Sequence, residues 1–366
     1  MRSLTGAALL LPLYACGATS ASSPSPAPAS LREQVDSLIQ PGIASGRWAS
    51  VMVGVYDRGA TAVFAYGRVR PDGPAPDTRT VYEIGSVTKT FTAALLAGLD
   101  REGQVRLDDP VRLHLPASVR VPAFAGQEIT LLHLATHSSG LPRLPDDLDR
   151  VPGFDMSDPY AHYGVDRLFA FLSRVPLARA PGTRYEYSNF AYAVLGQALA
   201  VVLQTSWDQA VLSRVVHPLG LADTRVALDP DQQARLATGH DEHGRVTPPW
   251  DMNAHAPAGA LRSTMQDMLQ YVAATLGHGA LATDLATCRQ PRFAPADQPF
   301  QLGLAWHLVP LGRTGRTYVF HNGGTGGFTS FVGSLPERDA GVAILTSSAN
   351  LADEQGEALL EWLVPR

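Results

Sequence analysis

The apolar positions near the start of the folded part predict one helix followed by two strands. Apolar side chains recur at helical spacing through residues 31–44, whereas residues 49–56 and 60–69 have the β-branched and aromatic content of strands. Asp57, Arg58 and Gly59 separate the two strand-like runs, and a short connection with glycine is typical of a hairpin. We therefore expect the chain to enter its fold through a helix and an antiparallel strand pair.

The middle of the chain is predicted to be mostly helical. Residues 110–290 combine helical periodicity with many proline and glycine loops. The pattern predicts helices over 129–136, 166–173, 192–203, 207–215 and 263–276. The last of these is expected to begin at Ser263, because Gln266 three residues later completes a capping box.

Strand character returns near the end of the chain. The pattern predicts strands over 302–309, 317–321, 329–334 and 341–346, and a final helix over 351–363. Strands at both ends with helices between them predict an α+β fold, in which the two ends build one antiparallel sheet flanked by helices. We expect one domain over 31–366, with a sheet subdomain at about 31–80 and 295–366 and an inserted helical subdomain at about 100–290.

Composition adds two exclusions to this picture. The 366 residues are 45% hydrophobic and 17% charged, which is ordinary for a globular protein. The formal net charge of -5 gives no basic footprint, so we expect no nucleic-acid partner. Beyond the N-terminal segment, no stretch has the roughly 18–20 uncharged apolar residues of a membrane-spanning helix.

Residues 1–30 are expected to be a targeting segment and a linker. Arg2 precedes an apolar run over 4–15, which has the length of a secretory signal and is too short to span a membrane. The residues before Cys16 resemble a bacterial lipoprotein processing site, so we predict an exported, periplasmic protein attached to a membrane through lipidated Cys16. The alternative is a soluble exported product. Residues 18–29 are rich in serine, proline and alanine, as linkers are, and Cys288 then lacks a disulfide partner and is expected to be a buried thiol.

The segment over residues 82–96 carries the first candidate chemistry. Ser86 and Lys89 are three residues apart at the start of a predicted helix, so their side chains share one face about 5–6 Å apart. A serine beside an amine is a candidate activated nucleophile, and the alternative is an N-cap serine followed by a surface lysine. Of the 29 lysines and arginines, only Lys89 is a lysine. Because an ammonium loses its proton far more readily than a guanidinium, this single exception favours a role in proton transfer.

Two further segments offer partners for that pair. Tyr187 and Asn189 are two residues apart in a polar, aromatic stretch, so they point the same way in extended backbone. A neighbouring ammonium is expected to lower the pKa of the Tyr187 phenol and make it a proton relay, the alternative being a loop in which the tyrosine packs and the asparagine makes a turn.

The second segment starts at His321 and Asn322 and continues with four glycines in the five positions 323–327, at the end of a predicted strand. Such a glycine-rich strand end permits close approach, and its N–H groups could stabilise an oxyanion. The alternative is a loose loop.

Metal ligation is a weaker alternative. His133 and His137 are four residues apart, but no glutamate lies between them as in a metalloprotease helix. His240 and His243 flank two carboxylates in a loop that looks exposed. We therefore expect no metal and no organic cofactor.

Taken together, these segments resemble the penicillin-recognising serine hydrolases, in the branch of class C β-lactamases, D-Ala-D-Ala peptidases and related esterases. The resemblance covers residues 31–366 and rests on three motifs in order: Ser86-Val87-Thr88-Lys89, Tyr187-Ser188-Asn189 and His321-Asn322-Gly323. Residues 129–142 and 257–264 also resemble this family. The family implies a β-lactamase/transpeptidase-like fold with the site in the cleft between sheet and helical subdomain.

By the same resemblance, Ser86 is the acylated nucleophile, and Lys89 and Tyr187 activate it and help to protonate the leaving nitrogen. Which of those two is the base stays open. Asn189 would hold a substrate amide, His321 and Gly323 would line the substrate site, and the N–H groups of Ser86 and Gly324 would form the oxyanion hole.

One departure bears on the substrate. Class C β-lactamases usually carry Lys-Thr-Gly where this chain has His321-Asn322-Gly323, and histidine occurs there in some D-Ala-D-Ala peptidases and esterases. An imidazole only partly charged near pH 7 would attract a substrate carboxylate less than a lysine does. The expected activity is β-lactam hydrolysis by a monomer, with D-Ala-D-Ala peptide cleavage or small-ester or amide hydrolysis as alternatives. A non-catalytic cell-wall-binding protein is a further alternative, although such a protein has no need of a proton relay.

Overall fold

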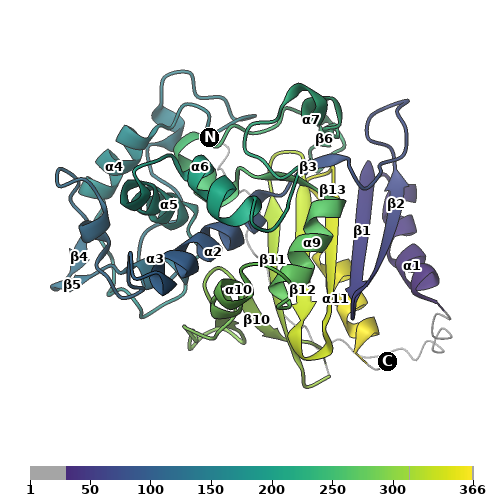
Figure 1. The fold of residues 1–366 in the computed structure, drawn as a ribbon. Coiled ribbons are helices and arrows are strands. Elements are labelled where there is room, and N and C mark those ends of the chain that lie inside the picture. Colours follow the sequence, from purple (N-terminus) through teal and green to yellow (C-terminus); the bar gives the residue numbers. More distant parts are fainter. Residues whose placement is uncertain (1–29, 313, 365–366) are drawn as a thin grey trace, which may run out of the picture.

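The computed structural model describes residues 30–312 and 314–364, so the predictions for the N-terminal segment, including Cys16, lie outside the described residues. Within them, seven antiparallel strands form one sheet in the order β2-β1-β13-β12-β11-β10-β9 (Figure 1). The strands are β1 (Ser50–Asp57), β2 (Ala60–Gly67), β9 (Gln301–Leu302), β10 (His307–Pro310), β11 (Thr317–Gly324), β12 (Thr329–Leu335) and β13 (Ala340–Thr346). β1 pairs with β13, with Val53 opposite Ile344, which confirms the predicted α+β sheet built from both chain ends.

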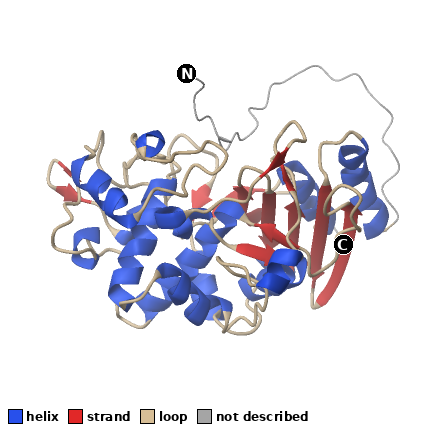
Figure 2. Ribbon diagram, turned by 90° about the horizontal axis from the view of Figure 1, so that it is seen from above, coloured by secondary structure: helices blue, strands red, loops and turns tan. Residues whose placement is uncertain are grey.

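Helices cover both faces of this sheet (Figures 1 and 2). They are α1 (Leu31–Ala44) and α11 (Asp353–Leu363) on one face and α9 (Met265–Thr275) on the other. Side chains alternate along β1, so Val51 and Val53 join the core under α1 and α11, whereas Met52 and Tyr56 join the core that includes α9. This alternation buries both faces of the central strands.

The core that includes α9 extends from the sheet into a group of helices beside the sheet (Figure 2). These are α2 (Thr88–Arg101), α3 (Leu131–Ala135), α4 (Val165–Arg174), α5 (Asn189–Leu203), α6 (Trp207–Val211), α8 (Ala256–Gly259) and α10 (Ala282–Cys288). The short helix α7 (Pro230–Ala234) adds no residue to this core. Short strand pairs link them: β3 (Val81–Glu83) with β8 (Arg262–Thr264), β4 (Ala123–Phe124) with β5 (Gln127–Glu128), and β6 (Gly239–His240) with β7 (Val246–Thr247).

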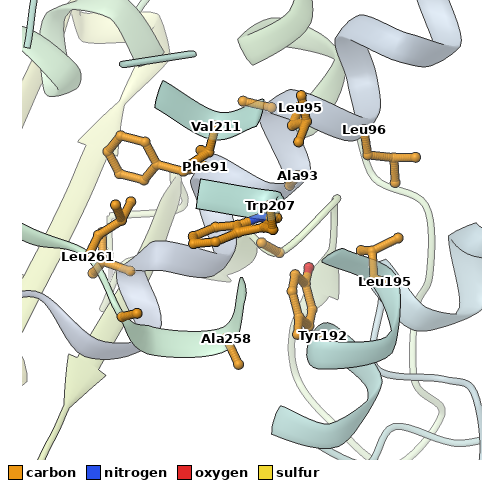
Figure 3. Packing of buried hydrophobic residues seen from close by; sticks show 14 of the residues in the cluster. Phe91, Ala93, Leu95, Leu96, Tyr192, Leu195, Trp207, Val211, Ala258 and Leu261 are labelled. Carbon is orange, nitrogen blue, oxygen red and sulfur yellow. The ribbon is translucent and has the colours of Figure 1, made fainter. Parts of the chain in front are cut away.

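Helix α2 lies at the centre of this core. Figure 3 shows Phe91 and Leu95 of α2 in one cluster with Tyr192, Trp207 and Leu261. All but one of the residues from Thr88 to Leu99 are buried, so α2 is a core helix rather than a surface helix. A lysine in its first turn is consequently held among apolar side chains.

Two predictions of element bounds are wrong. The helix expected from Ser263 begins at Met265, because Ser263 lies in β8 and its hydroxyl is hydrogen-bonded to Thr224. Thr264 is the N-cap instead, and its Oγ1 accepts from the Asp267 N–H.

The strand expected over residues 302–309 is interrupted. The chain turns after β9 because Leu304 N donates to Cys288 O (2.8 Å) and Ala305 N donates to Ala135 O (3.0 Å). Ala305 has φ +68°, which is outside the strand region, and β10 starts only at His307.

Two further expectations from the sequence, on Cys288 and on membrane-spanning helices, can be compared with the structure. Cys288 is a free, fully buried thiol, as expected. Within residues 30–312 and 314–364, no single helix has the length and apolar character to cross a membrane, although α5 and the segment Trp207–Val216 reach them together across a 77° bend.

Candidate active site

Ser86 lies in a single helical turn, Gly85–Val87, between β3 and α2. Gly85 has φ +47°, and a Cβ there would lie 2.5 Å from the backbone nitrogen of Gly324. Ser330 Oγ donates to the Ile84 carbonyl (2.7 Å), which ties this turn to β12. The backbone is therefore held tightly against the sheet while the Ser86 side chain stays partly accessible.

Lys89 is fully buried directly behind Ser86. Its Nζ is hydrogen-bonded to Ser86 Oγ at 2.9 Å and donates to the Ala258 carbonyl at 2.6 Å. Burial, and then the nearby charge of Arg143, hold the pKa of Lys89 well below its usual value. The structure thus brings together the two residues that the sequence paired, with an amine whose neutral form is favoured.

Tyr187 faces the same pair. The Lys89 nitrogen lies 4.9 Å from the centre of the Tyr187 ring, and a hydrogen bond joins Tyr187 to Ser86. Burial raises the pKa of Tyr187 to about 12, although the bond to Ser86 and the charge of Arg143 oppose the rise. The expectation of a lowered pKa was wrong, because the loss of hydration on burial of the phenol outweighs the hydrogen bond to Ser86 and the charge of Arg143.

Asn189 opens α5, two residues after Tyr187. Ser188 is the N-cap, and its Oγ accepts from Ala191 N (2.8 Å) and donates to Pro142 O (2.6 Å). The Asn189 side chain donates from Nδ2 to Tyr160 Oη (3.4 Å), and its Oδ1 is buried with no protein partner. An amide oxygen in this position can accept a hydrogen bond from a ligand N–H.

His321 lies on β11, and the centre of its ring is 6.2 Å from the centre of the Tyr187 ring. It is fully buried, and its Nδ1 lies 2.5 Å from the Asn322 carbonyl, so Nδ1 carries the proton and Nε2 is the acceptor. Burial, then the proximity of His307 and Lys89, hold the pKa of His321 well below its usual value. The sequence predicted a partly charged imidazole at His321. That prediction is wrong, because the lowered pKa leaves His321 neutral near pH 7.

The next side chain along β11 points to the other face of the sheet. Asn322 Nδ2 donates to Asp353 Oδ2 of α11 at 2.5 Å. Burial raises the pKa of Asp353 to about 6. The strand that carries His321 is thereby fastened to the helix behind the sheet.

Gly323 and Gly324 end β11 against the Ser86 turn. A Cβ on Gly323 would overlap the Ile84 carbonyl oxygen, so only glycine fits there. Gly324 pairs with Thr329 of β12, and its backbone nitrogen faces Gly85. The first two glycines of the segment thus belong to β11, whereas Gly326 and Gly327 lie in the connection to β12.

Several groups near Ser86 received no role from the sequence. The Ala258 carbonyl holds Lys89, and His137 stacks on Tyr187 with ring centres 4.3 Å apart. The guanidinium carbon of Arg143 lies 5.2 Å from the Tyr187 ring centre. These residues fall in or next to the two supporting stretches of the resemblance, but only packing shows which of their atoms reach the site.

The histidine pairs that suggested metal binding do not converge. α3 ends at Ala135 and His137 has φ +54°, so His133 and His137 do not share a helix face. His133 Nδ1 accepts from Thr130 N in a capping box, and His240 is bonded to Ser347 O. Among the described residues, no group of three or more His, Cys, Asp or Glu side chains could hold a metal ion.

Comparisons with known proteins show the family of this chain. The profile of the Beta-lactamase family matches residues 35–365. The chain is 31% identical over 324 residues to the D-alanyl-D-alanine-carboxypeptidase/endopeptidase AmpH of Escherichia coli (strain K12), covering 84% of this chain and 81% of that protein. It is 26% identical over 350 residues to a β-lactamase of Pseudomonas fluorescens, covering 87% of this chain and 93% of the relative.

A solved structure is similar over nearly its whole length. The β-lactamase/D-alanine carboxypeptidase from Yersinia pestis complexed with citrate has a TM-score of 0.79 and 25% identity, covering 91% of this chain and 98% of that chain.

Proposed function

Because the chain belongs to the Beta-lactamase family and is a serine hydrolase with the class C β-lactamase fold, we propose that it forms an acyl-enzyme at Ser86 and hydrolyses β-lactam amides. The observation that carries this proposal is the 2.9 Å contact between Ser86 Oγ and Lys89 Nζ inside the core. An amine in this place is suited to take a proton and poorly suited to carry a surface charge.

Lys89 is the general base in this proposal. In the structure Lys89 Nζ donates to the Ala258 carbonyl and to Ser86 Oγ. For the reaction, the neutral amine keeps its bond to Ala258 and takes the Ser86 proton on its lone pair as the serine oxygen attacks the carbonyl carbon. Tyr187 has a pKa of about 12 and therefore enters the reaction as a phenol. The buried amine and the phenol with a raised pKa both support Lys89, rather than Tyr187, as the base that we propose.

Tyr187 then acts as a proton carrier. When the tetrahedral intermediate breaks down, the phenol gives its proton to the leaving nitrogen, and the Lys89 ammonium returns a proton to Tyr187. The N–H groups of Ser86 and Gly324 would meet the developing oxyanion, since the Ser86 turn and the end of β11 are packed together. Asn189 would accept from the substrate amide through its unpartnered Oδ1. Lys89 then activates a water molecule, which attacks the acyl-enzyme and releases Ser86.

D-alanyl-peptide cleavage is the second candidate, and His321 favours it. Where class C β-lactamases usually have a lysine, this chain has a buried imidazole that is neutral near pH 7. The site therefore lacks at this position the cation that attracts the carboxylate of a β-lactam. The peptidase name of the 31% identical relative agrees with this candidate.

A substrate panel tests the proposal. Wild type and Ser86→Ala are compared on nitrocefin, a D-Ala-D-Ala peptide and a p-nitrophenyl ester, with mass spectrometry of the protein after each reaction. Ser86-dependent nitrocefin turnover supports the β-lactamase. A stable penicillin adduct on Ser86 without turnover favours the peptidase. A fluorophosphonate probe tests for a reactive serine, and a folded protein that it does not label supports a non-catalytic binder.

Export, lipidation and assembly complete the proposal. The apolar run over residues 4–15 followed by Cys16 supports export to the periplasm and membrane attachment through a lipid on Cys16. A Cys16→Ser variant that leaves the detergent phase for the aqueous phase would support lipidation. We propose a monomer that binds small-molecule substrates and no nucleic acid, and size-exclusion chromatography with light scattering tests that state.

A further inference from the structure

Arg143 is fixed beside the residues that would hold the substrate. Its carbonyl accepts from Phe190 N (3.2 Å), and the preceding Pro142 carbonyl accepts from Ser188 Oγ (2.6 Å). Asn189 lies between those two donors in the chain. The backbone of Arg143 is therefore aligned with the start of α5, next to Asn189.

The Arg143 guanidinium reaches into the site. Its central carbon lies 5.2 Å from the centre of the Tyr187 ring, and its charge acts on both Lys89 and Tyr187. The side chain is only partly buried, so a ligand can meet it.

Arg143 differs in charge from the other groups at this site. Lys89 has its neutral form favoured, Tyr187 is a phenol, and His321 is a neutral imidazole near pH 7. A guanidinium keeps its charge throughout this range and matches the two oxygens of a carboxylate with parallel N–H donors. His321, at which the sequence led us to expect a weak carboxylate contact, is thus neutral, whereas the guanidinium of Arg143 is a permanent cation 5.2 Å from the centre of the Tyr187 ring.

We infer that Arg143 is a specificity-determining residue that selects acyl groups carrying a carboxylate, bound on the Asn189 side of Ser86. The inference rests on the proposed acyl transfer at Ser86 and on Asn189 as the contact for the acyl amide. The substrate class it names is an ester, peptide or lactam whose acyl part bears an anionic group.

Two esters of the same shape test this inference. p-Nitrophenyl hydrogen adipate and p-nitrophenyl hexanoate differ mainly in a terminal carboxylate, so the ratio of their kcat/KM values reports recognition of that group. Because both are measured on one preparation, the ratio is independent of the folded fraction. In wild type we expect the adipate to be favoured, and in Arg143→Gln we expect the ratio to fall by about 10-fold or more, as for loss of a charge-assisted hydrogen bond.

Two variants serve as controls. Arg150→Gln removes the same charge from an exposed residue of the same loop and should leave the ratio unchanged. Arg143→Lys keeps a cation and should restore part of the ratio, less than the arginine because lysine offers no planar fork. A second ester pair, 3-carboxyphenyl hexanoate and phenyl hexanoate, places the carboxylate on the leaving group instead.

The outcomes separate this inference from the proposed function. Ester hydrolysis that persists in Ser86→Ala overturns the proposed function and the inference with it. If hydrolysis depends on Ser86 but the adipate-to-hexanoate ratio of kcat/KM is unchanged in Arg143→Gln, the inference alone is overturned. It is also overturned if only the ratio for the leaving-group ester pair falls. A fall confined to the adipate pair supports it.

Discussion

Lys89 Nζ lies 2.9 Å from Ser86 Oγ and has no solvent exposure. The only lysine of the chain is thus placed where its charged form is disfavoured. Because its pKa is lowered by burial, this amine can lose its proton more easily than an exposed lysine and is placed to act as the base that we propose for Ser86.

Lys89→Arg is expected to lower kcat/KM for any substrate by at least about 100-fold, although it keeps the formal charge. A guanidinium cannot accept the Ser86 proton, and general-base catalysis typically contributes about 10²–10⁴-fold. Nitrocefin or ester turnover measures the loss, with circular dichroism to verify folding. Near-normal activity would refute the role of Lys89 as base.

The activity of the wild type should rise as pH rises through the pKa of Lys89. Only the neutral amine accepts a proton, and burial places that pKa well below its usual value, so the acidic limb of kcat/KM lies far below that of an ordinary lysine. Arg143→Gln removes a charge that lowers the pKa of Lys89 and should move the limb to higher pH. A limb that stays in place would show that Lys89 is not the group that titrates.

Lys89→Met should stabilise the protein at neutral pH and inactivate it. The unfolded lysine titrates near pH 10.4 and the folded one lower, so wild-type stability rises with pH by about 1.4 kcal/mol per unit between the two pKa values. The stability gain of the variant is therefore greatest at low pH and vanishes above about pH 10.5. Urea unfolding of both proteins across pH measures this difference, and a constant difference would contradict it.

Gly323→Ala and Gly324→Ala form a matched pair in β11. A Cβ at Gly323 overlaps the Ile84 carbonyl, whereas at Gly324 the nearest contact is Thr329 Cγ2 at 4.0 Å. We expect the first change to cost about 1–3 kcal/mol of stability and most activity, as overpacking does, and the second to cost less than about 1 kcal/mol. Thermal unfolding and ester turnover test this order. Equal effects would mean that the close approach of β11 to the Ser86 turn is not needed.

His321→Lys should shift preference toward β-lactams with a carboxylate. The imidazole is neutral, so the change places on β11, near Tyr187, a cation additional to Arg143. The measure is the ratio of kcat/KM for nitrocefin to that for a neutral ester, with His321→Gln as the uncharged control. An unchanged ratio in both variants would show that His321 does not contact the carboxylate.

The sequence predicted much of the sheet because its signals are local. The helix expected over 31–44 is α1 with the same bounds, and the hairpin around Arg58 and Gly59 joins β1 and β2. Both elements depend on side-chain periodicity and turn residues within a short window. The prediction that both chain ends share one sheet, as β1 and β13 do, rested on the order of strands and helices along the chain and not on the sequence of any single strand.

The errors arise where distant contacts decide. Ser263 has the spacing of an N-cap, but pairing with Tyr82 in β3 draws it into a strand, and Thr264 takes over the cap. The lowered pKa expected for Tyr187 assumed that a neighbouring charge decides it, and only the packing shows that burial of the phenol raises that pKa instead. Arg143 reaches the site through bonds to the start of α5 that no sequence pattern records.

The pairing of β1 with β13 also sets the order in which the protein can mature. The chain segment with Ser86 leaves the ribosome long before β11, β12 and β13, and β1, which pairs with the adjacent β2, gains its second neighbour only when β13 has been made. Such long-range closure is slow, and an incomplete sheet leaves β1 with an open edge. The sheet therefore cannot close, and Gly324 cannot pack against the Ser86 turn, until nearly all of the chain has been synthesised.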